Sequence, residues 1–456
     1  MVLVLGSNNK VTHLQLTVQQ SKALQKMEAF IDSPELFFGL YGYAGTGKST
    51  VIFNLIEKLK YLGKKVVLTA PTNKALGVLR KMSKKKLIRA DLCTIHQLLG
   101  LAPVKVGTEK VLKQVSQNNL HYYDVVVLDE CSMVSTELWE IIKKQINQNN
   151  SLFDGGTKII VMGDPGQLPP VSSSGVNERR SPSFSLKNKA VLTEVVRQGA
   201  DSPLLEFVTA CRQTLKTREV FKPFSLKSAD KKNGALIVGQ ETLLKYNLKK
   251  FATKFDSNPD CYRMLCYTNK RVDYWNSQVR KFVYGKNAPR FLDGERLIAR
   301  SPIIAPDGKT TIFPTSTEFQ ITDVEEDFYA GYAAWKLEVR TDYDDDCGGS
   351  DTRQVYCLHE DGKESFDKDN ARLLKSAKSN PVLWKAWYEH SEIFADVRNC
   401  WALTVHNSQG STFEEVGIDG KDINRKAYGQ NGSVRECNQL WYVGASRAKN
   451  RVLITS

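Results

Sequence analysis

The feature that most constrains this chain is a glycine-rich segment from Gly42 to Ser49, which reads Gly-Tyr-Ala-Gly-Thr-Gly-Lys-Ser. An apolar run at residues 36–41 precedes it, and a segment with helical periodicity at residues 50–59 follows it. This order predicts a strand, a phosphate-binding loop and a helix, because curled backbone N–H groups and a helix N-terminus together attract an anion. Lys48 would reach the β- and γ-phosphates of a nucleoside triphosphate, and the Ser49 hydroxyl would ligate Mg²⁺. We therefore expect an α/β fold that binds ATP.

The charge balance of the chain points to a polyanionic partner. Lys and Arg number 64 against 50 Asp and Glu, which gives a net charge of +14 over 456 residues. Beside a phosphate-binding loop this balance suggests nucleic acid, although a basic surface that only aids solubility is an equal alternative. The nine cysteines form no Cys-x-x-Cys pair, so structural zinc is not expected. No apolar run approaches the roughly 20 residues that span a bilayer, and we expect a cytoplasmic protein without a membrane partner.

A second strand-and-loop segment carries two adjacent carboxylates. Asp129 and Glu130 end an apolar strand, which is the Walker B pattern. Asp129 would hold Mg²⁺ through water, and Glu130 would orient and deprotonate the attacking water. The pair favours hydrolysis over transfer to a substrate hydroxyl. Gln167, on the Pro/Gly turn after the next strand, is placed to sense a γ-phosphate, and Arg197 is a further candidate cation.

Polar residues also follow other predicted strands, where ligands bind in open α/β sheets. The apolar strand at 64–70 ends in Pro71, Thr72 and Asn73. His96 opens a short apolar helix, and it is either a capping or core histidine or a phosphate contact. Gln20, in a predicted helix at 17–31, has an amide that can pair with adenine, or it is a solvated helix residue.

Three further regions complete the pattern. Residues 104–111 alternate around Gly107 and predict a small β-hairpin between strands of the sheet. A second α/β segment begins near the strand at 264–270. From Gly285 to about residue 380, short alternating strands predict a small antiparallel barrel, and residues 381–394 return to helix. No internal repeat is apparent in the sequence.

Together these segments resemble the superfamily 1 helicases, and within them the 5′→3′ branch, superfamily 1B, of the RecD and Dda type. The matching motifs, in the order and spacing of that family, are Gly42–Ser49, Ala70–Ala75, Asp129-Glu130, Gly163–Val171, Thr404–Thr412 and Tyr442–Lys449. The resemblance extends from about Leu16 to the C-terminus.

The resemblance implies an α/β fold of two RecA-like P-loop domains in tandem, with a small β-hairpin insertion in the first and an SH3-like β-barrel insertion in the second. The implied bounds are 1–102 and 121–192 for domain 1A, 103–120 for the hairpin or pin 1B, 193–284 and 390–456 for domain 2A, and 285–389 for the barrel 2B.

The resemblance also implies the roles of individual residues. Gln20 contacts adenine, Gln167 and Arg197 contact the γ-phosphate, and Arg447 is an arginine finger that acts when the cleft between the domains closes. The implied ATP-binding residues are Gln20, Gly42, Ala44, Gly45, Thr46, Gly47, Lys48, Ser49 and Gly410, with Ser49 and Asp129 holding Mg²⁺. The implied DNA-binding residues are Pro71, Thr72, Asn73, Thr94, His96, Thr268, Asn269, Thr404 and His406.

The implied activity is that of an ATP-dependent DNA helicase that moves 5′→3′ on single-stranded DNA and separates duplex. Its cofactors are ATP and Mg²⁺, and its partners are single-stranded DNA and single-strand/duplex junctions, with single-strand-binding or replication proteins as candidates. The resemblance further implies a monomer, in the host bacterial cytoplasm if a phage encodes it. Only the resemblance gives the direction of movement.

Several residues depart from the family pattern, and two other functions stay open. Tyr43 stands where relatives often carry Pro, and Asn407 where many carry Lys. The predicted hairpin has no aromatic residue between Val104 and Val111, which favours the first alternative, a DNA-stimulated translocase that displaces bound proteins without efficient unwinding. The second alternative is a P-loop kinase or a nucleotide-gated binding module, whose ATP turnover would be indifferent to DNA.

Overall fold

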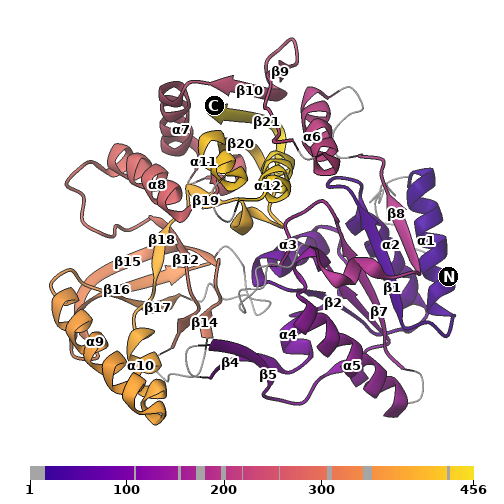
Figure 1. The fold of residues 1–456 in the computed structure, drawn as a ribbon, viewed down its shortest axis with the longest axis horizontal. Helices are drawn as coiled ribbons and strands as arrows, with labels where there is room; N and C mark the ends of the chain where they lie inside the picture. Colours follow the sequence, from indigo (N-terminus) through magenta and orange to yellow (C-terminus); the bar gives the residue numbers. More distant parts are fainter. Residues whose placement is uncertain are drawn as a thin grey trace, which may run out of the picture.

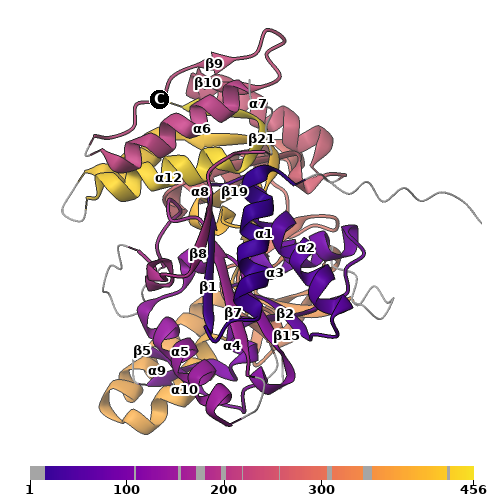
Figure 2. The ribbon, with the colours of Figure 1, turned by 90° about the vertical axis from the view of Figure 1, so that its right-hand side faces the viewer.

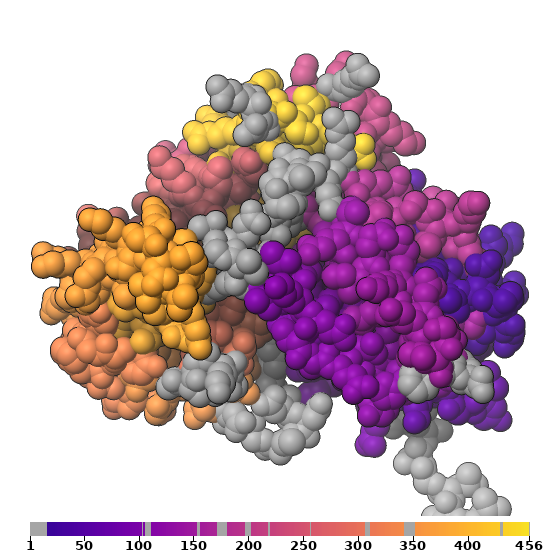
Figure 3. Space-filling model, turned by 60° about the horizontal axis from the view of Figure 1, so that its bottom comes forward, coloured from indigo at the N-terminus to yellow at the C-terminus, as the bar shows by residue number. Residues whose placement is uncertain are grey.

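The computed structural model describes residues 16–106, 109–152, 156–170, 180–196, 202–217, 219–255, 257–305, 311–341, 352–428 and 432–455. Two parallel α/β sheets and one antiparallel insertion sheet form its three bodies (Figure 1). Seen from below, the insertion (orange) and the first α/β body (purple) lie as two lobes side by side (Figure 3). Arg197 and the loop residues near it lie outside the described residues.

The first sheet has six parallel strands in the order β3-β2-β6-β7-β1-β8. The strands are β1 (Phe37–Gly42), β2 (Val66–Ala70), β3 (Asp91–Thr94), β6 (Val125–Leu128), β7 (Lys158–Gly163) and β8 (Lys189–Leu192). The helices that cover it are α1 (Val18–Ile31), α2 (Lys48–Tyr61) and α3 (Asn73–Lys85) on one face, and α4 (Ile95–Leu98) and α5 (Thr136–Leu152) on the other. Because both faces are covered, the strands are almost wholly apolar, as the sequence predicts.

The second sheet also has six strands, in the order β19-β11-β20-β21-β10-β9, of which all but β9 are parallel. The strands are β9 (Leu226–Lys227), β10 (Gly234–Val238), β11 (Tyr262–Cys266), β19 (Ala402–Thr404), β20 (Phe413–Asp419) and β21 (Ala448–Thr455). Its helices are α6 (Pro203–Gln213), α7 (Gln240–Lys254), α8 (Asn269–Tyr284), α11 (Gly420–Asn424) and α12 (Val434–Ser446). Helices α6 and α12 pack along each other (Figure 2). Two parallel sheets in tandem confirm the α/β prediction.

A two-stranded antiparallel hairpin stands where the sequence predicts one. It consists of β4 (Leu101–Val106) and β5 (Glu109–Gln114), with Val104 opposite Val111. Its base is anchored by buried Leu101 in the core under α5, and its strands extend toward the insertion (Figures 1 and 2).

The insertion is built on a five-stranded antiparallel sheet in the order β17-β16-β15-β12-β18. The strands are β12 (Arg296–Ala299), β15 (Glu318–Tyr329), β16 (Tyr332–Arg340), β17 (Arg353–Leu358) and β18 (Val397–Asn399), beside a separate pair, β13 (Ile303–Ile304) and β14 (Thr311–Phe313). The strands that the sequence predicts at residues 296–300, 318–324, 334–339 and 354–358 are present as β12, β15, β16 and β17. Closure into an SH3-like barrel stays a prediction.

Two features of the insertion differ from the simple expectation of strands up to about residue 380. Helix α9 (Lys363–Ser379) lies in that range, followed by the expected helix as α10 (Trp384–Ser391). Of the residues in α9 only Phe366 and Ala377 are buried, so the sequence has no apolar stripe from which to predict it. Strand β18 lies after residue 389 yet pairs with β12. The domain bounds stay predictions. Among the described helices none combines the length and apolar character that a membrane span requires.

Candidate nucleotide site and nucleic-acid interface

The phosphate-binding loop has the backbone that its glycines predict. Gly45 and Gly47 have φ of 81° and 78°, in the left-handed region that favours glycine. A Cβ on Gly47 would lie 2.4 Å from Gln20 Nε2, so the position also lacks space for a side chain. Lys48 begins α2, and its Nζ donates to the carbonyls of Gly42 (2.9 Å) and Tyr43 (3.0 Å). The lysine thus lies across the loop that would hold a phosphate.

Gln20 supports this loop from behind. Its Nε2 donates to the Thr46 carbonyl (3.0 Å), and its Oε1 accepts from the backbone N–H of Thr17 (3.0 Å), which caps α1. The side chain is 5% exposed. Gln20 therefore links α1 to the phosphate-binding loop, while its contact with adenine stays a prediction. Gly42 and Thr46 likewise shape the loop and do not line the cavity described below.

The two Walker B carboxylates follow β6 in a strained turn. Glu130 has φ 50° and ψ 43°, a left-handed conformation that costs about 1–3 kcal/mol for a residue with a side chain. Its N–H donates to Asp129 Oδ1 (2.7 Å), whereas its own Oε2 is buried and has no hydrogen-bond partner among the described residues. Burial and the neighbouring Glu130 charge raise the pKa of Asp129 to about 7. A divalent cation held by Ser49 and Asp129 would favour the ionised carboxylate and fits this oxygen-rich corner.

One cavity of about 270 Å³ brings residues of both sheets together. From the first sheet it is lined by Ala44, Gly45, Gly47, Lys48, Ser49, Asp129, Glu130 and Gln167, and from the second by Gly410 and Arg447. All of these are site residues that the sequence and the resemblance predict. The prediction missed Thr50, Ala75, Val78, Met82, Val196 and Thr412, which also line the cavity. Ala75 and Thr412 end two of the motifs quoted above, Ala70–Ala75 and Thr404–Thr412, whereas no local sequence pattern marks Val78, Met82 or Val196.

Arg447 presents its charge to this cavity. It is 5% exposed and donates to the Val443 carbonyl (3.2 Å), the Ser411 carbonyl (3.3 Å) and Ser446 Oγ (3.0 Å). All three acceptors are neutral, and within the described part of the chain no carboxylate forms an ion pair with Arg447. A guanidinium that is buried beside neutral acceptors alone is suited to an anion in the cavity.

A second set of contacts links the loop to the second sheet, and the sequence did not predict it. Asp164, at the end of β7, is fully buried and accepts from the Ala44 N–H (3.1 Å) and from the Tyr442 hydroxyl. Its other oxygen accepts from Arg212 Nη1 (2.7 Å), and the Arg212 guanidinium lies 3.6 Å from the centre of the Tyr43 ring. Burial and the Asp164 carboxylate raise the pKa of Tyr442, which therefore stays a donor.

Part of this second set could have been found from the sequence. Asp164 stands three residues before Gln167 in a polar turn that was already singled out. Arg212 lies on an ordinary amphipathic helix, α6, and nothing near it in the sequence marks it.

The predicted DNA-binding segments come together in pairs. In the first sheet, Ala70 of β2 lies opposite Thr94 of β3, so Pro71, Thr72 and Asn73 leave the sheet beside the Thr94 segment. In the second sheet, Cys266 of β11 lies opposite Thr404 of β19, which places Thr268 and Asn269 beside the Thr404 segment. Each sheet therefore has one polar cluster at the carboxyl ends of two neighbouring strands.

The threonines of these clusters also have local structural roles. Each hydroxyl oxygen accepts from a backbone N–H three residues later: Thr72 from Ala75 (3.3 Å), Thr94 from Gln97 (3.2 Å), Thr268 from Arg271 (3.3 Å) and Thr404 from Asn407 (3.2 Å). Burial lowers the pKa of both His96 and His406, so both imidazoles are neutral at pH 7. Contact of any of these side chains with DNA stays a prediction.

The fold and the site define an α/β nucleotide-binding protein with two parallel P-loop-type sheets and a cavity between them. A family model described as an AAA domain matches residues 15–222. The ATP-dependent DNA helicase Dda of Enterobacteria phage T4 is 26% identical to this chain, over 96% of this chain and 99% of that protein. The RecD subunit of the RecBCD enzyme of Buchnera aphidicola is 22% identical, over 95% and 72% of the two chains.

Solved structures of Pif1 helicases share the fold along nearly the whole chain. A Pif1 structure at forked double-stranded DNA matches with a TM-score of 0.52 and 17% identity, over 96% of this chain and 92% of that one. Pif1 from Bacteroides in complex with ADP-AlF3 and single-stranded DNA matches with a TM-score of 0.51 and 18% identity, over the same shares. Along nearly its whole length the chain is therefore similar to helicases of the RecD and Dda type, and it shares the fold of Pif1 helicases.

Proposed function

We propose that this protein is an ATP-dependent DNA helicase that moves 5′→3′ on single-stranded DNA and separates the duplex ahead of it. The observation that carries the proposal is the cavity in which Lys48, Asp129 and Glu130 of the first sheet face Arg447 of the second. Hydrolysis at such a site depends on how closely the two sheets approach. The full-length relative Dda is named an ATP-dependent DNA helicase, and the direction of movement rests on this kinship.

The chemistry follows from the positions of these side chains. Lys48 and Arg447 stabilise negative charge that builds up on the γ-phosphate, and Glu130 takes a proton from the attacking water. Mg²⁺, held by Ser49 and Asp129, would neutralise phosphate charge. Gln167 is tied to both sheets, because its carbonyl accepts from Gln439 Nε2 of α12 (2.8 Å) and its Oε1 accepts from Ser132 Oγ (3.4 Å). We assign it, with Arg197, to sensing the γ-phosphate.

Closure of the cavity would also move DNA. The two polar clusters, one per sheet, would each hold the backbone of one strand, so closing and opening changes the distance between two grips. Pif1 relatives have been solved with single-stranded DNA and with forked duplex, which supports these partners. We further propose that the protein acts as a monomer in the cytoplasm.

Unwinding of matched duplexes tests this proposal. Duplexes with a 5′ tail or a 3′ tail of the same sequence are incubated with protein, ATP and Mg²⁺, and strand release is followed by fluorescence. We expect release from the 5′-tailed duplex only, and none with Lys48→Ala, which should still bind DNA. Release only from the 3′-tailed duplex would overturn the direction.

One observation favours a second candidate, a translocase that displaces bound proteins without efficient unwinding. The hairpin β4–β5 carries no aromatic residue between Val104 and Val111 to stack against a base pair. If neither duplex is unwound but streptavidin leaves a biotinylated single strand under ATP, the translocase replaces the helicase.

A further inference from the structure

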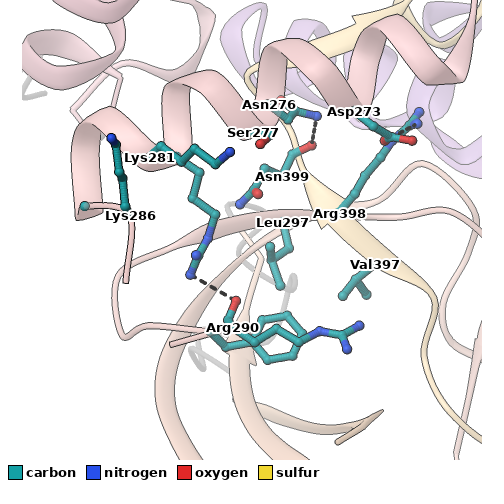
Figure 4. Close-up of a pocket in the computed structure, with 13 residues that line it drawn as sticks. Asp273, Asn276, Ser277, Lys281, Lys286, Arg290, Leu297, Val397, Arg398 and Asn399 are labelled. Atoms are coloured by element: carbon teal, nitrogen blue, oxygen red, sulfur yellow. Dashed lines mark hydrogen bonds and ion pairs between the residues drawn. The ribbon is translucent and has the colours of Figure 1, made fainter. Parts of the chain in front are cut away.

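A second cavity lies away from the nucleotide, between the C-terminal half of α8 and the insertion strands β12 and β18 (Figure 4). Its volume is about 360 Å³. The charged residues that line it are Arg280, Lys281, Lys286, Arg290 and Arg398, against the single carboxylate of Asp273. Figure 4 shows Lys281 and Lys286 at one end of the hollow and Arg398 with Asp273 at the other.

Part of this positive charge is neutralised within the protein. Arg280 pairs with Glu295, which is fully buried (2.7 Å), Arg290 lies 3.4 Å from exposed Glu360, and Arg398 lies 3.6 Å from Asp273. Lys281 and Lys286 are exposed, and no ion pair of either is seen in the described ranges. Two lysines at one end of the hollow therefore remain without a balancing carboxylate in the described part of the chain, an arrangement that attracts anions.

Arg398 has one N–H that the described residues do not satisfy, although its Nη1 lies 3.6 Å from Asp273 Oδ1. Its side chain is 9% exposed, yet its Nε is buried without a hydrogen-bond partner among the described residues. Burial lowers the pKa of Arg398, and the charge of Asp273 opposes this shift only in part. A buried guanidinium with an unsatisfied N–H is unfavourable unless an anion accepts from it.

The cavity is continuous with the predicted DNA grip of the second sheet. Arg398 Nη1 donates to Asn269 Oδ1 (2.9 Å), and Asn269 is the first residue of α8. Asp273, Asn276 and Arg280 follow at helical spacing and line the hollow, so one face of α8 leads from the grip into the cavity. The helix has 16 residues and a length of about 24 Å, enough to follow several nucleotides of an extended strand.

We propose that this cavity binds the phosphodiester backbone of single-stranded DNA, next to the grip at Thr268 and Asn269. The inference rests on the proposed function, since it assumes that the grip holds DNA. Lys281 and Lys286 contact phosphates at the outer end, and Arg398 donates to a phosphate at the end nearer the grip. The second sheet would then hold a longer stretch of strand than the first, and its hold would be sequence-independent.

The salt dependence of DNA binding tests the site. Lys281→Ala/Lys286→Ala is compared with a matched control, Lys22→Ala/Lys26→Ala, which removes two exposed lysines of α1 on the far side of the molecule. Binding of oligothymidylate is measured by fluorescence anisotropy across a salt series. Oligomers of about 8 and about 16 nucleotides are used, because both lengths fall within the site sizes of single-strand-binding domains. Thermal unfolding verifies that the variants fold.

We expect the Lys281→Ala/Lys286→Ala variant to differ from the parent only with the oligomer of about 16 nucleotides. Loss of two phosphate contacts should reduce the slope of log affinity against log salt by about 1.4, since each phosphate contributes about 0.7 on a single strand. The control pair should keep the slope of the parent. If Lys281→Ala/Lys286→Ala binds DNA with the same salt slope as the parent, the inference about this cavity is wrong and the proposed function is unaffected. Absence of DNA binding by the parent would instead overturn the proposed function.

A small anion is the remaining occupant to distinguish. Inorganic phosphate is titrated into the parent and the Lys281→Ala/Lys286→Ala variant by calorimetry. Phosphate binding that the variant loses, together with an unchanged DNA slope, would assign the cavity to a free phosphate and contradict the proposal.

Discussion

The two α/β sheets of this protein share the order of five parallel strands, and only one of the sheets has a phosphate-binding loop. Strands β3, β2, β6, β7 and β1 of the first sheet correspond, in space and along the chain, to β19, β11, β20, β21 and β10 of the second. The register agrees too, because Ala70 pairs with Thr94 at the position where Cys266 pairs with Thr404. The sixth strands do not correspond: β9 is antiparallel and precedes β10 in the chain, whereas β8 is parallel and follows the other strands of the first sheet.

Short segments of sequence repeat at these equivalent places. Thr-Asn-Lys occurs after β2 at residues 72–74 and after β11 at residues 268–270. Thr-x-His-x-x-x-Gly occurs at 94–100 and again at 404–410, and both glycines, Gly100 and Gly410, have positive φ. These matches are confined to short loops, and the strands and helices around them do not repeat in sequence. The expectation that the sequence has no internal repeat stays a prediction.

The difference lies between the first strand and the first helix of each sheet. In the first sheet, residues 43–47 separate β1 from α2, whereas Gly239 alone separates β10 from α7. A single residue cannot curl several N–H groups around a phosphate, so the second sheet has no cradle of its own. It supplies Arg447 and Gly410 instead. On the proposed function, the first sheet binds the nucleotide and the second responds to it.

The largest expected effect comes from removing the charge that the second sheet supplies. Arg447→Ala should lower kcat for ATP by about 10³-fold with little change in KM, because an arginine finger acts mainly on the transition state. Arg435→Ala, which removes an arginine from the first turn of α12, is the matched control. Steady-state ATP turnover checks this. A kcat within a factor of two of the parent would show that the second sheet takes no part in hydrolysis.

The two equivalent glycines should differ in their tolerance of a side chain. A Cβ on Gly100 would lie 2.2 Å from the Ser116 carbonyl oxygen, whereas on Gly410 it would lie 3.5 Å from the nearest atom, Ala75 Cα. We expect Gly100→Ala to lower the free energy of unfolding by about 3 kcal/mol, from clash and positive φ together. Gly410→Ala should cost only about 1 kcal/mol. Equal losses in denaturant unfolding would contradict this difference in the surroundings of the two loops.

The contact between the phosphate-binding loop and the second sheet should matter for both stability and coupling. Tyr442→Phe removes a buried hydroxyl that donates to Asp164 and accepts from the Ala44 N–H. We expect a loss of about 1–3 kcal/mol of unfolding free energy and weaker stimulation of ATP turnover by DNA. Tyr428→Phe, at a tyrosine that is 68% exposed, is the control. If Tyr442→Phe has the same unfolding free energy and the same stimulation of ATP turnover by DNA as the parent, the contact has no role in either.

The smallest expected effect concerns His96 and His406, which stand at equivalent positions of the two sheets. The pKa of His406 is lowered by burial in the folded protein, as is that of His96. The unfolded chain therefore binds more protons below pH 6.5, and stability present above that pH is lost as the pH falls through the lowered pKa. We expect His406→Gln to reduce this acid loss by about 1 kcal/mol or less. Unfolding midpoints of the parent and of His406→Gln, measured between pH 7 and pH 5, check this, and an equal acid loss in both proteins would contradict it.

The sequence predicted the nucleotide site better than the rest of the molecule, for a physical reason. Phosphate and metal binding need particular residues at short spacing, so Lys48, Asp129 and Glu130 could be identified locally. Contacts such as Asp164 with Tyr442 join residues 278 apart, and they depend on how the two sheets pack. Helix α9 has too narrow a buried face to be predicted, and the short pairing of β18 with β12 leaves no pattern in the sequence.

The central claim is that the two sheets form one motor, with ATP on one side and DNA across both. ATP turnover with and without oligothymidylate tests it most directly, in the parent and in Arg447→Ala. We predict at least a ten-fold stimulation of the parent, of the size that a stabilising contact of about 1.4 kcal/mol gives, and no stimulation of the variant. Turnover by the parent that is indifferent to single-stranded DNA would contradict the account and favour a P-loop kinase or a nucleotide-gated binding module.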